Sequence, residues 1–312
     1  MEIRKTVVPN SSKGTPLTDV GEREFIFFKV RYNHFRDVSG SIEHAVLDRE
    51  EFAECECVLS LPKTYTEDGE ETPLILSFHG SGGRVSEAEN MIGGVHYVTQ
   101  CVDAGYAALD VCGSELHGVT MGCPEHLFAA YKAYRYVVKH FNVSERVLVS
   151  GASMGGHVAI NFANTFPSIT TALGIFYPRL NIDGVQVGDH FCIGTWNKTT
   201  AKEGGTSAHD RIIDIYRFPT SDWCEKNTVG FNAYRTRSFV NAKGERVVIP
   251  PCPIKIWQGT ADTTVDPVMV AEFVNSIRRS GSYVECHMVE GIGHKLTSVM
   301  REEQLLWFNR FI

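Results

Sequence analysis

The stretch VLVSGASMGGHVAI (Val147–Ile160) indicates the fold most strongly. A short apolar run, typical of a buried strand, ends at Gly151, and an apolar segment with helical character continues to Phe166. Between them Gly151, Ser153 and Gly155 form the pattern G-x-S-x-G. In a nucleophile elbow this pattern makes a sharp strand-to-helix turn that exposes the serine hydroxyl. An ordinary Gly/Ser-rich turn is the simpler interpretation, but the strand–turn–helix context favours the elbow, with Ser153 as candidate nucleophile.

Continuous apolar runs recur on both sides of this stretch. Runs of this kind are typical of strands buried on both faces of a parallel sheet. Between the runs, apolar residues spaced three and four apart predict helices from Leu127 to Phe141 and from Val270 to Ile277. The alternation predicts an α/β fold, with a mostly parallel central sheet and helices on both faces. The expected strands lie at residues 73–78, 106–111, 146–151, 171–177, 254–259 and 282–289.

The chain divides into an arm, a domain and an insertion. Residues 1–22 are mostly polar and predict an N-terminal arm, and residues 23–312 predict one catalytic domain. Within that domain, about 178–251 interrupts the strand–helix alternation with glycine pairs and many aromatic residues. We interpret this insertion between late strands as a cap or lid. Its Trp196 and Trp223 are candidates for stacking on sugar rings, and equally for the small core of the lid itself.

A glycine-rich loop follows the expected strand at residues 73–78. The loop reads HGSGGR from His79 to Arg84, and its flexible backbone would let N–H groups approach a substrate closely. An oxyanion hole in this architecture takes one N–H from the residue after the nucleophile, here Met154, and one from this loop, here Ser81 or Gly82. Phosphate binding is the rival interpretation, but neither glycine spacing of a phosphate loop is present.

Candidate acid and base residues follow the last two expected strands. Asp262 and Asp266 both come after the strand at 254–259. Asp266 precedes Pro267 and an amphipathic helix, so helix capping already explains it, and we predict Asp262 to be the acid. His294 follows the strand at 282–289 and is the predicted base. The chain order Ser, Asp, His is the one expected of this architecture.

For the remaining histidines we expect structural roles. His79 is expected to support the glycine-rich loop and His157 to be packed and hydrogen-bonded. His117 and His126 are expected to be structural or to lie at the rim of the site. No histidine pair has the spacing of a metal site, so we expect neither a metal nor another cofactor.

Composition excludes several other classes of function. The chain has 312 residues and a formal net charge of −7, with no run of Lys and Arg, so neither nucleic acid nor an anionic membrane is an expected partner. No stretch approaches the roughly 18 apolar residues of a membrane helix. Nine scattered cysteines favour free, mostly buried thiols over a disulfide framework. The N-terminus has no apolar segment of a secretory signal, so we expect a cytoplasmic protein, or a secreted one if a signal has been removed.

Four motifs together resemble the α/β-hydrolase superfamily. They are HGSGG (residues 79–83), GASMGGH (151–157), GTADTTVD (259–266) and GIGH (291–294), and the resemblance covers roughly Leu59 to Ile312. Within the superfamily the chain is most similar to esterase-D-like, feruloyl- and acetylxylan-esterase-like and prolyl-oligopeptidase-like hydrolases. The resemblance implies a Ser153–His294–Asp262 triad that forms an acyl-enzyme.

Three functions follow as hypotheses. The first is a serine esterase acting on a small-molecule or oligo- or polysaccharide ester, removing acetyl, feruloyl or similar groups from sugars. The second is a peptidase like prolyl oligopeptidase, although no β-propeller precedes the hydrolase core in this sequence. The third is an inactive hydrolase fold that serves as a binding module.

Overall fold

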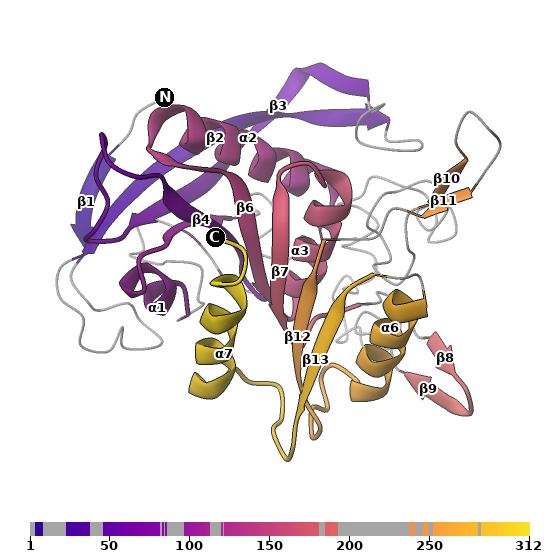
Figure 1. Cartoon of the computed structure of the whole chain (residues 1–312). Helices are drawn as coiled ribbons and strands as arrows, with labels where there is room; N and C mark the ends of the chain where they lie inside the picture. The colour runs from indigo at the N-terminus through magenta and orange to yellow at the C-terminus, as the bar shows by residue number, and fades with distance from the viewer. Residues whose placement is uncertain are drawn as a thin grey trace, which may run out of the picture.

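The computed structural model describes residues 4–8, 23–37, 46–81, 83, 85, 97–112, 120, 122–180, 185–192, 238–240, 246–248, 252–279 and 282–312. Its centre is a sheet of strand order β1-β2-β3-β5-β4-β6-β7-β12-β13 (Figure 1). In this order, β1–β2, β2–β3 and β3–β5 are antiparallel pairs. All the following pairs, from β5–β4 to β12–β13, are parallel. The strands are β1 (Arg4–Val8), β2 (Arg23–Asp37), β3 (Val46–Leu61), β4 (Thr72–Phe78), β5 (Ala107–Val111), β6 (Val143–Ala152), β7 (Thr170–Phe176), β12 (Ile254–Gly259) and β13 (Val284–Val289).

Helices cover both faces of this sheet. Side chains of α2, α3 and α6 belong to the apolar cluster on one face, and side chains of α1 and α7 belong to the cluster on the other. Both faces of the central parallel strands are therefore buried, which explains their continuous apolar runs. The predicted fold class is confirmed. The helices are α1 (Tyr97–Asp103), α2 (Pro124–His140), α3 (Met154–Thr165), α6 (Pro267–Arg279) and α7 (Ser298–Phe308).

The antiparallel end of the sheet begins inside the predicted arm. Residues 4–8 form β1, which pairs along its length with β2. β2 in turn pairs with β3, and both are long strands. Cys55 and Cys57 of β3 are both free thiols buried in the same apolar cluster. Residues 4–8 thus extend the main sheet.

The insertion between β7 and β12 is described in part. It contains two short antiparallel ribbons, β8 (Val185–Val187) with β9 (His190–Cys192), and β10 (Ser238–Val240) with β11 (Arg246–Val248). The first ribbon lies beside α6 (Figure 1). Trp196 and Trp223 lie outside the described residues, so the cap and its sugar-stacking surface stay predictions.

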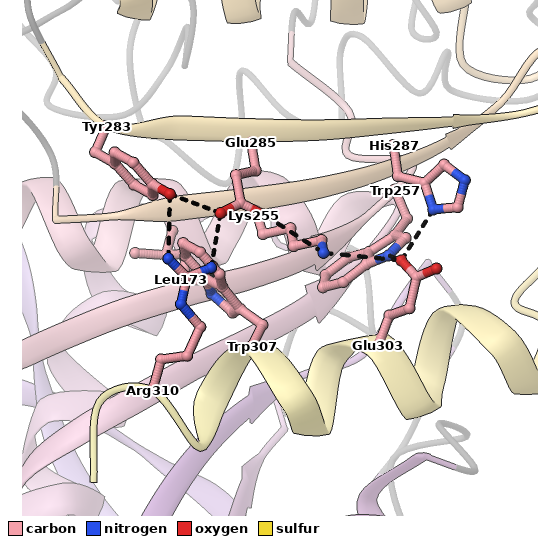
Figure 2. Close-up of polar contacts among 9 residues, drawn as sticks. All are labelled: Leu173, Lys255, Trp257, Tyr283, Glu285, His287, Glu303, Trp307 and Arg310. Carbon is pink, nitrogen blue, oxygen red and sulfur yellow. Dashed lines mark hydrogen bonds and ion pairs between the residues drawn. The ribbon is translucent and has the colours of Figure 1, made fainter.

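Polar contacts fasten α7 to the last strands of the sheet. Glu303 of α7 accepts hydrogen bonds from Trp257 Nε1 at 2.7 Å and from His287 Nδ1 at 2.9 Å (Figure 2). Trp307 Nε1 donates to the carbonyl oxygen of Leu173 at 2.8 Å. The loop between β13 and α7 is therefore held at both ends, and this loop carries His294. Among the described helices, none combines the length and the apolar character needed to cross a membrane.

Candidate active site

Ser153 occupies a strained turn between β6 and α3. Its backbone angles are φ 56° and ψ −120°, a left-handed region that a residue with a side chain rarely adopts. A Cβ added to Gly151 would overlap the carbonyl oxygen of Gly155, and one added to Gly155 would overlap that of Phe78. Only glycine fits at both positions. The turn is therefore the strand–turn–helix elbow that the motif predicts, and strain of this kind is concentrated at functional sites.

Ser153, His294 and Asp262 form one hydrogen-bonded chain. His294 Nε2 lies 3.1 Å from Ser153 Oγ, and His294 Nδ1 lies 2.8 Å from Asp262 Oδ2. Asp262 follows β12, His294 follows β13 and Ser153 follows β6. All three lie beyond the carboxyl ends of parallel strands, where open α/β sheets form their sites. The structure thus brings together the three residues that the sequence singles out.

The carboxylate of Asp262 is buried and fully hydrogen-bonded. Its Oδ1 accepts from the backbone N–H groups of Thr264 at 2.8 Å and Val265 at 2.9 Å, and its Oδ2 also accepts from Gln258 Nε2 at 3.2 Å. Burial by itself raises the pKa of Asp262, but the hydrogen bonds from His294, Val265 and Thr264 outweigh it, so the pKa is lower than usual. Asp262 is therefore ionised at neutral pH and fixes the orientation of His294.

Asp266, the other candidate for the acid, caps a helix and contacts His190. Its Oδ1 accepts from the backbone N–H of Val268 at 2.9 Å in the first turn of α6, as expected of a helix cap. Its Oδ2 lies 2.8 Å from Nε2 of His190, on the β8–β9 ribbon. Both oxygens of Asp266 thus contact groups other than His294.

The two segments that contain the predicted oxyanion donors lie beside Ser153. Met154 is the first residue of α3 and is buried, and the N–H groups of a first helical turn have no partner within the helix. A Cβ added to Gly80 would lie 3.7 Å from Ser153 Cβ, so the glycine-rich loop runs beside the nucleophile. Gly83 N donates to Gly80 O at 3.0 Å and closes a turn around Ser81. Gly82 lies outside the described residues, and the choice of loop donor stays a prediction.

The other described histidines of this region are buried and hydrogen-bonded. His157 Nδ1 lies 2.9 Å from the Arg179 carbonyl oxygen, and His79 Nδ1 lies 2.8 Å from that of Gly80. His126 Nδ1 lies 2.6 Å from Thr120 Oγ1, and burial lowers the pKa of His126 to about 3. These contacts match the structural roles that the sequence predicts. His117 lies outside the described part of the chain.

Two residues that sequence reasoning missed also line the site. Tyr177 directly follows β7 and has a φ of 33°, and its ring stands edge-on to His294 with centroids 4.4 Å apart. Arg179, two residues on, donates its backbone N–H to the Ser153 carbonyl oxygen at 2.9 Å. The only signal in the sequence was position, because Tyr177 is the last residue of the strand expected at 171–177 and Arg179 follows two residues later. In the part of the chain that the structure describes, no three His, Cys, Asp or Glu side chains form a metal-binding group.

Comparisons with known proteins support the fold. No protein-family model and no curated protein matches this sequence. Among solved structures, a lipase/esterase from Lactobacillus plantarum aligns at a TM-score of 0.55 with 14% identity, over 85% of this chain and 95% of that one. Esterase 2 of Thermogutta terrifontis, phosphoramylated by tabun, aligns at 0.51 with 18% identity, over 83% of this chain and 89% of that one.

A third solved structure comes from a much longer chain. A putative dipeptidyl aminopeptidase IV from Bacteroides ovatus aligns at 0.55 with 14% identity, over 91% of this chain and 35% of that one. Together with the sheet order and the elbow, these likenesses show that the chain has the α/β-hydrolase fold.

Proposed function

We propose that the protein is a serine hydrolase that cleaves carboxylic esters through an acyl-enzyme. The observation that carries this proposal is the continuous hydrogen-bonded chain from Asp262 through His294 to Ser153, with the serine on a strained elbow. A nucleophile, a base and a group that orients the base are the three parts that acyl transfer needs. The description of the Lactobacillus plantarum and Thermogutta terrifontis proteins as esterases supports the same class.

In the proposed mechanism each residue has one step. His294 Nε2 takes the proton from Ser153 Oγ as the oxygen attacks the ester carbonyl carbon. The N–H of Met154 and the glycine-rich loop stabilise the oxyanion of the tetrahedral intermediate. The intermediate expels the alcohol, which receives the proton from His294, and leaves an acyl group on Ser153. Water then repeats the attack with His294 as base, which releases the acid and restores the serine. Asp262 stabilises the imidazolium in both halves of the reaction.

We propose a small acyl ester on a carbohydrate as the preferred substrate class. The motif resemblance to acetylxylan and feruloyl esterases and the aromatic insertion support this choice, with Trp196 and Trp223 as the proposed stacking residues. The test compares acetate release from acetylated xylo-oligosaccharides and from phenyl acetate. Equal kcat/KM values on the two would remove the carbohydrate preference.

The experiment for the enzyme class uses p-nitrophenyl acetate, butyrate and octanoate with the wild type and Ser153→Ala. We expect turnover by the wild type, fastest on the short esters, and a loss of about six orders of magnitude in kcat in the variant. Activity that survives the substitution would overturn the assignment of Ser153.

A peptidase is the second candidate, because one aligned structure is described as a putative dipeptidyl aminopeptidase. The aligned region is 35% of that chain, so most of that protein has no counterpart in the alignment. Dipeptidyl p-nitroanilides measure this activity directly. We expect turnover at least 100-fold slower than on p-nitrophenyl acetate, and the reverse order would favour the peptidase.

A further inference from the structure

Arg179 is a buried cation in direct contact with the nucleophile turn. Its backbone N–H donates to the Ser153 carbonyl oxygen at 2.9 Å, and its own carbonyl oxygen lies 2.9 Å from His157 Nδ1. The residue is only 7% exposed. These two contacts place Arg179 against both the elbow and the first turn of α3.

The guanidinium of Arg179 has no hydrogen-bond or ion-pair partner among the residues that the structure describes. A guanidinium carries five N–H donors, and arginines buried to this extent are almost always paired. Burial lowers the pKa of Arg179 to about 10 against the opposing effect of Asp262, so the side chain is still a cation at neutral pH. A buried charge without a hydrogen-bonding partner is costly, and a bound anion would supply the partner that the described residues do not provide.

Asp262 is the carboxylate near enough to act electrostatically on Arg179, but its hydrogen-bonding capacity is already used. Four other groups donate to its two oxygens: His294 Nδ1, Gln258 Nε2, Thr264 N and Val265 N. Arg179 therefore lies in the field of the triad acid without forming its hydrogen-bonded partner. Among the described residues, the guanidinium of Arg179 therefore has a carboxylate nearby but no acceptor for its N–H groups.

We propose that the guanidinium of Arg179 binds a carboxylate carried by the substrate close to its scissile ester. The inference rests on the proposed function and narrows its substrate class to anionic esters. A planar guanidinium matches a carboxylate in bidentate geometry, which gives strength and direction to the contact. The carboxylate belongs either to the acyl group or to the alcohol, and the two sources can be separated by experiment.

The test compares matched pairs of esters that differ in charge. On the acyl side, mono-p-nitrophenyl glutarate is compared with p-nitrophenyl pentanoate, after subtraction of the spontaneous rates. On the alcohol side, 3-acetoxybenzoate is compared with 3-acetoxybenzamide by acetate release. The measured quantity is the ratio of kcat/KM for the anionic ester to that for the neutral one. The enzymes are the wild type, Arg179→Met, Arg179→Lys and the control Arg279→Met, which removes the same charge from the exposed end of α6.

In one of the two pairs we expect a wild-type ratio of at least about 10, lowered about 10- to 100-fold in Arg179→Met. Arg179→Lys is expected to fall between them and Arg279→Met to keep the wild-type ratio. The pair that responds identifies which side of the ester carries the carboxylate. Ratios near 1 in both pairs would overturn the proposal. An equal loss of kcat/KM on the anionic and the neutral ester in Arg179→Met would also overturn it, because that result is expected if Arg179 only positions Asp262 and does not contact the substrate.

Failure of the proposed function gives a different pattern. If the wild type hydrolyses none of the four esters, the esterase assignment fails, and calorimetry with glutarate and 3-hydroxybenzoate then tests Arg179 alone. Binding to the wild type that disappears in Arg179→Met upholds an anion site. Absence of binding to the wild type overturns it.

Discussion

His294 and Asp262 are joined by a hydrogen bond of 2.8 Å between Nδ1 and Oδ2, and this bond leaves Nε2 of the same ring facing Ser153. Because the carboxylate is ionised, it holds the proton on Nδ1 and keeps Nε2 free to act as a base. We therefore expect Asp262→Asn to lower kcat on p-nitrophenyl acetate about 10,000-fold with an unchanged circular dichroism spectrum. A loss of less than tenfold would mean that Asp262 does not orient the base.

A variant of Asp266, matched to Asp262→Asn, separates catalysis from helix capping. Asp266→Ala removes the acceptor for the Val268 N–H and the contact with His190, so we expect a loss of about 1 kcal/mol in the free energy of unfolding. Its kcat should stay within about threefold of the wild type. Urea unfolding and ester turnover together give both quantities. A kcat loss like that of Asp262→Asn would reverse the two assignments.

The glycines around the elbow differ in what a methyl group would meet. In Gly155→Ala the new Cβ overlaps the Phe78 backbone, which cannot move without shifting β4, so we expect a stability loss of about 3 kcal/mol or more. In Gly80→Ala the nearest atom is Ala152 O at 3.5 Å, an ordinary contact, and stability should change little. The same methyl group lies beside Ser153, so turnover should fall.

Thermal unfolding of the two glycine variants, measured beside turnover, checks this contrast. A fully stable Gly155→Ala would contradict the close approach of α3 to β4. An unchanged turnover of Gly80→Ala would mean that substrate does not approach the serine from that side.

The buried carboxyl group of Asp110, in β5, is expected to make the free energy of unfolding depend on pH. Burial raises the pKa of its carboxyl to about 7, and neither oxygen has a hydrogen-bond partner among the described residues. Between pH 4 and 7 the unfolded chain loses this proton while the folded chain retains it, so stability falls as pH rises, on the order of 1 kcal/mol per pH unit. Asp110→Asn removes this dependence. Its advantage in melting temperature over the wild type should grow from pH 4.5 to 7.5, and an advantage independent of pH would contradict the account.

The placement of the three candidate residues in one hydrogen-bonded chain could be predicted from the sequence because each residue follows a recognisable strand. The runs before Ser153 and Asp262 are apolar enough to indicate buried parallel strands. The run before His294 forms β13, the partly exposed strand at the edge of the sheet, and all three strands end on the same side. Asp266 could be set aside because Pro267 and the amphipathic pattern of α6 identify a helix cap. The motifs and the topology agree at every one of these positions.

Other features depend on contacts between residues far apart in sequence. Residues 4–8 carry no sign of their pairing with β2 beyond a few apolar side chains, since the partner strand decides whether such a segment joins a sheet. The seven-residue helix α1 is too short for its periodicity to stand out. The burial of Arg179 arises from the turn after β7, which the position of Tyr177 at positive φ helps to set. Nothing local in the sequence distinguishes this arginine from a surface one.

Covalent labelling tests whether Ser153 is a nucleophile activated by His294. The wild type, Ser153→Ala and the surface control Ser298→Ala are incubated with a fluorophosphonate, and intact mass and peptide mapping then locate the adduct. We expect one adduct on the wild type and on the control, located at Ser153, and none on Ser153→Ala. A wild type that stays unlabelled, or an adduct that persists in Ser153→Ala, would contradict it.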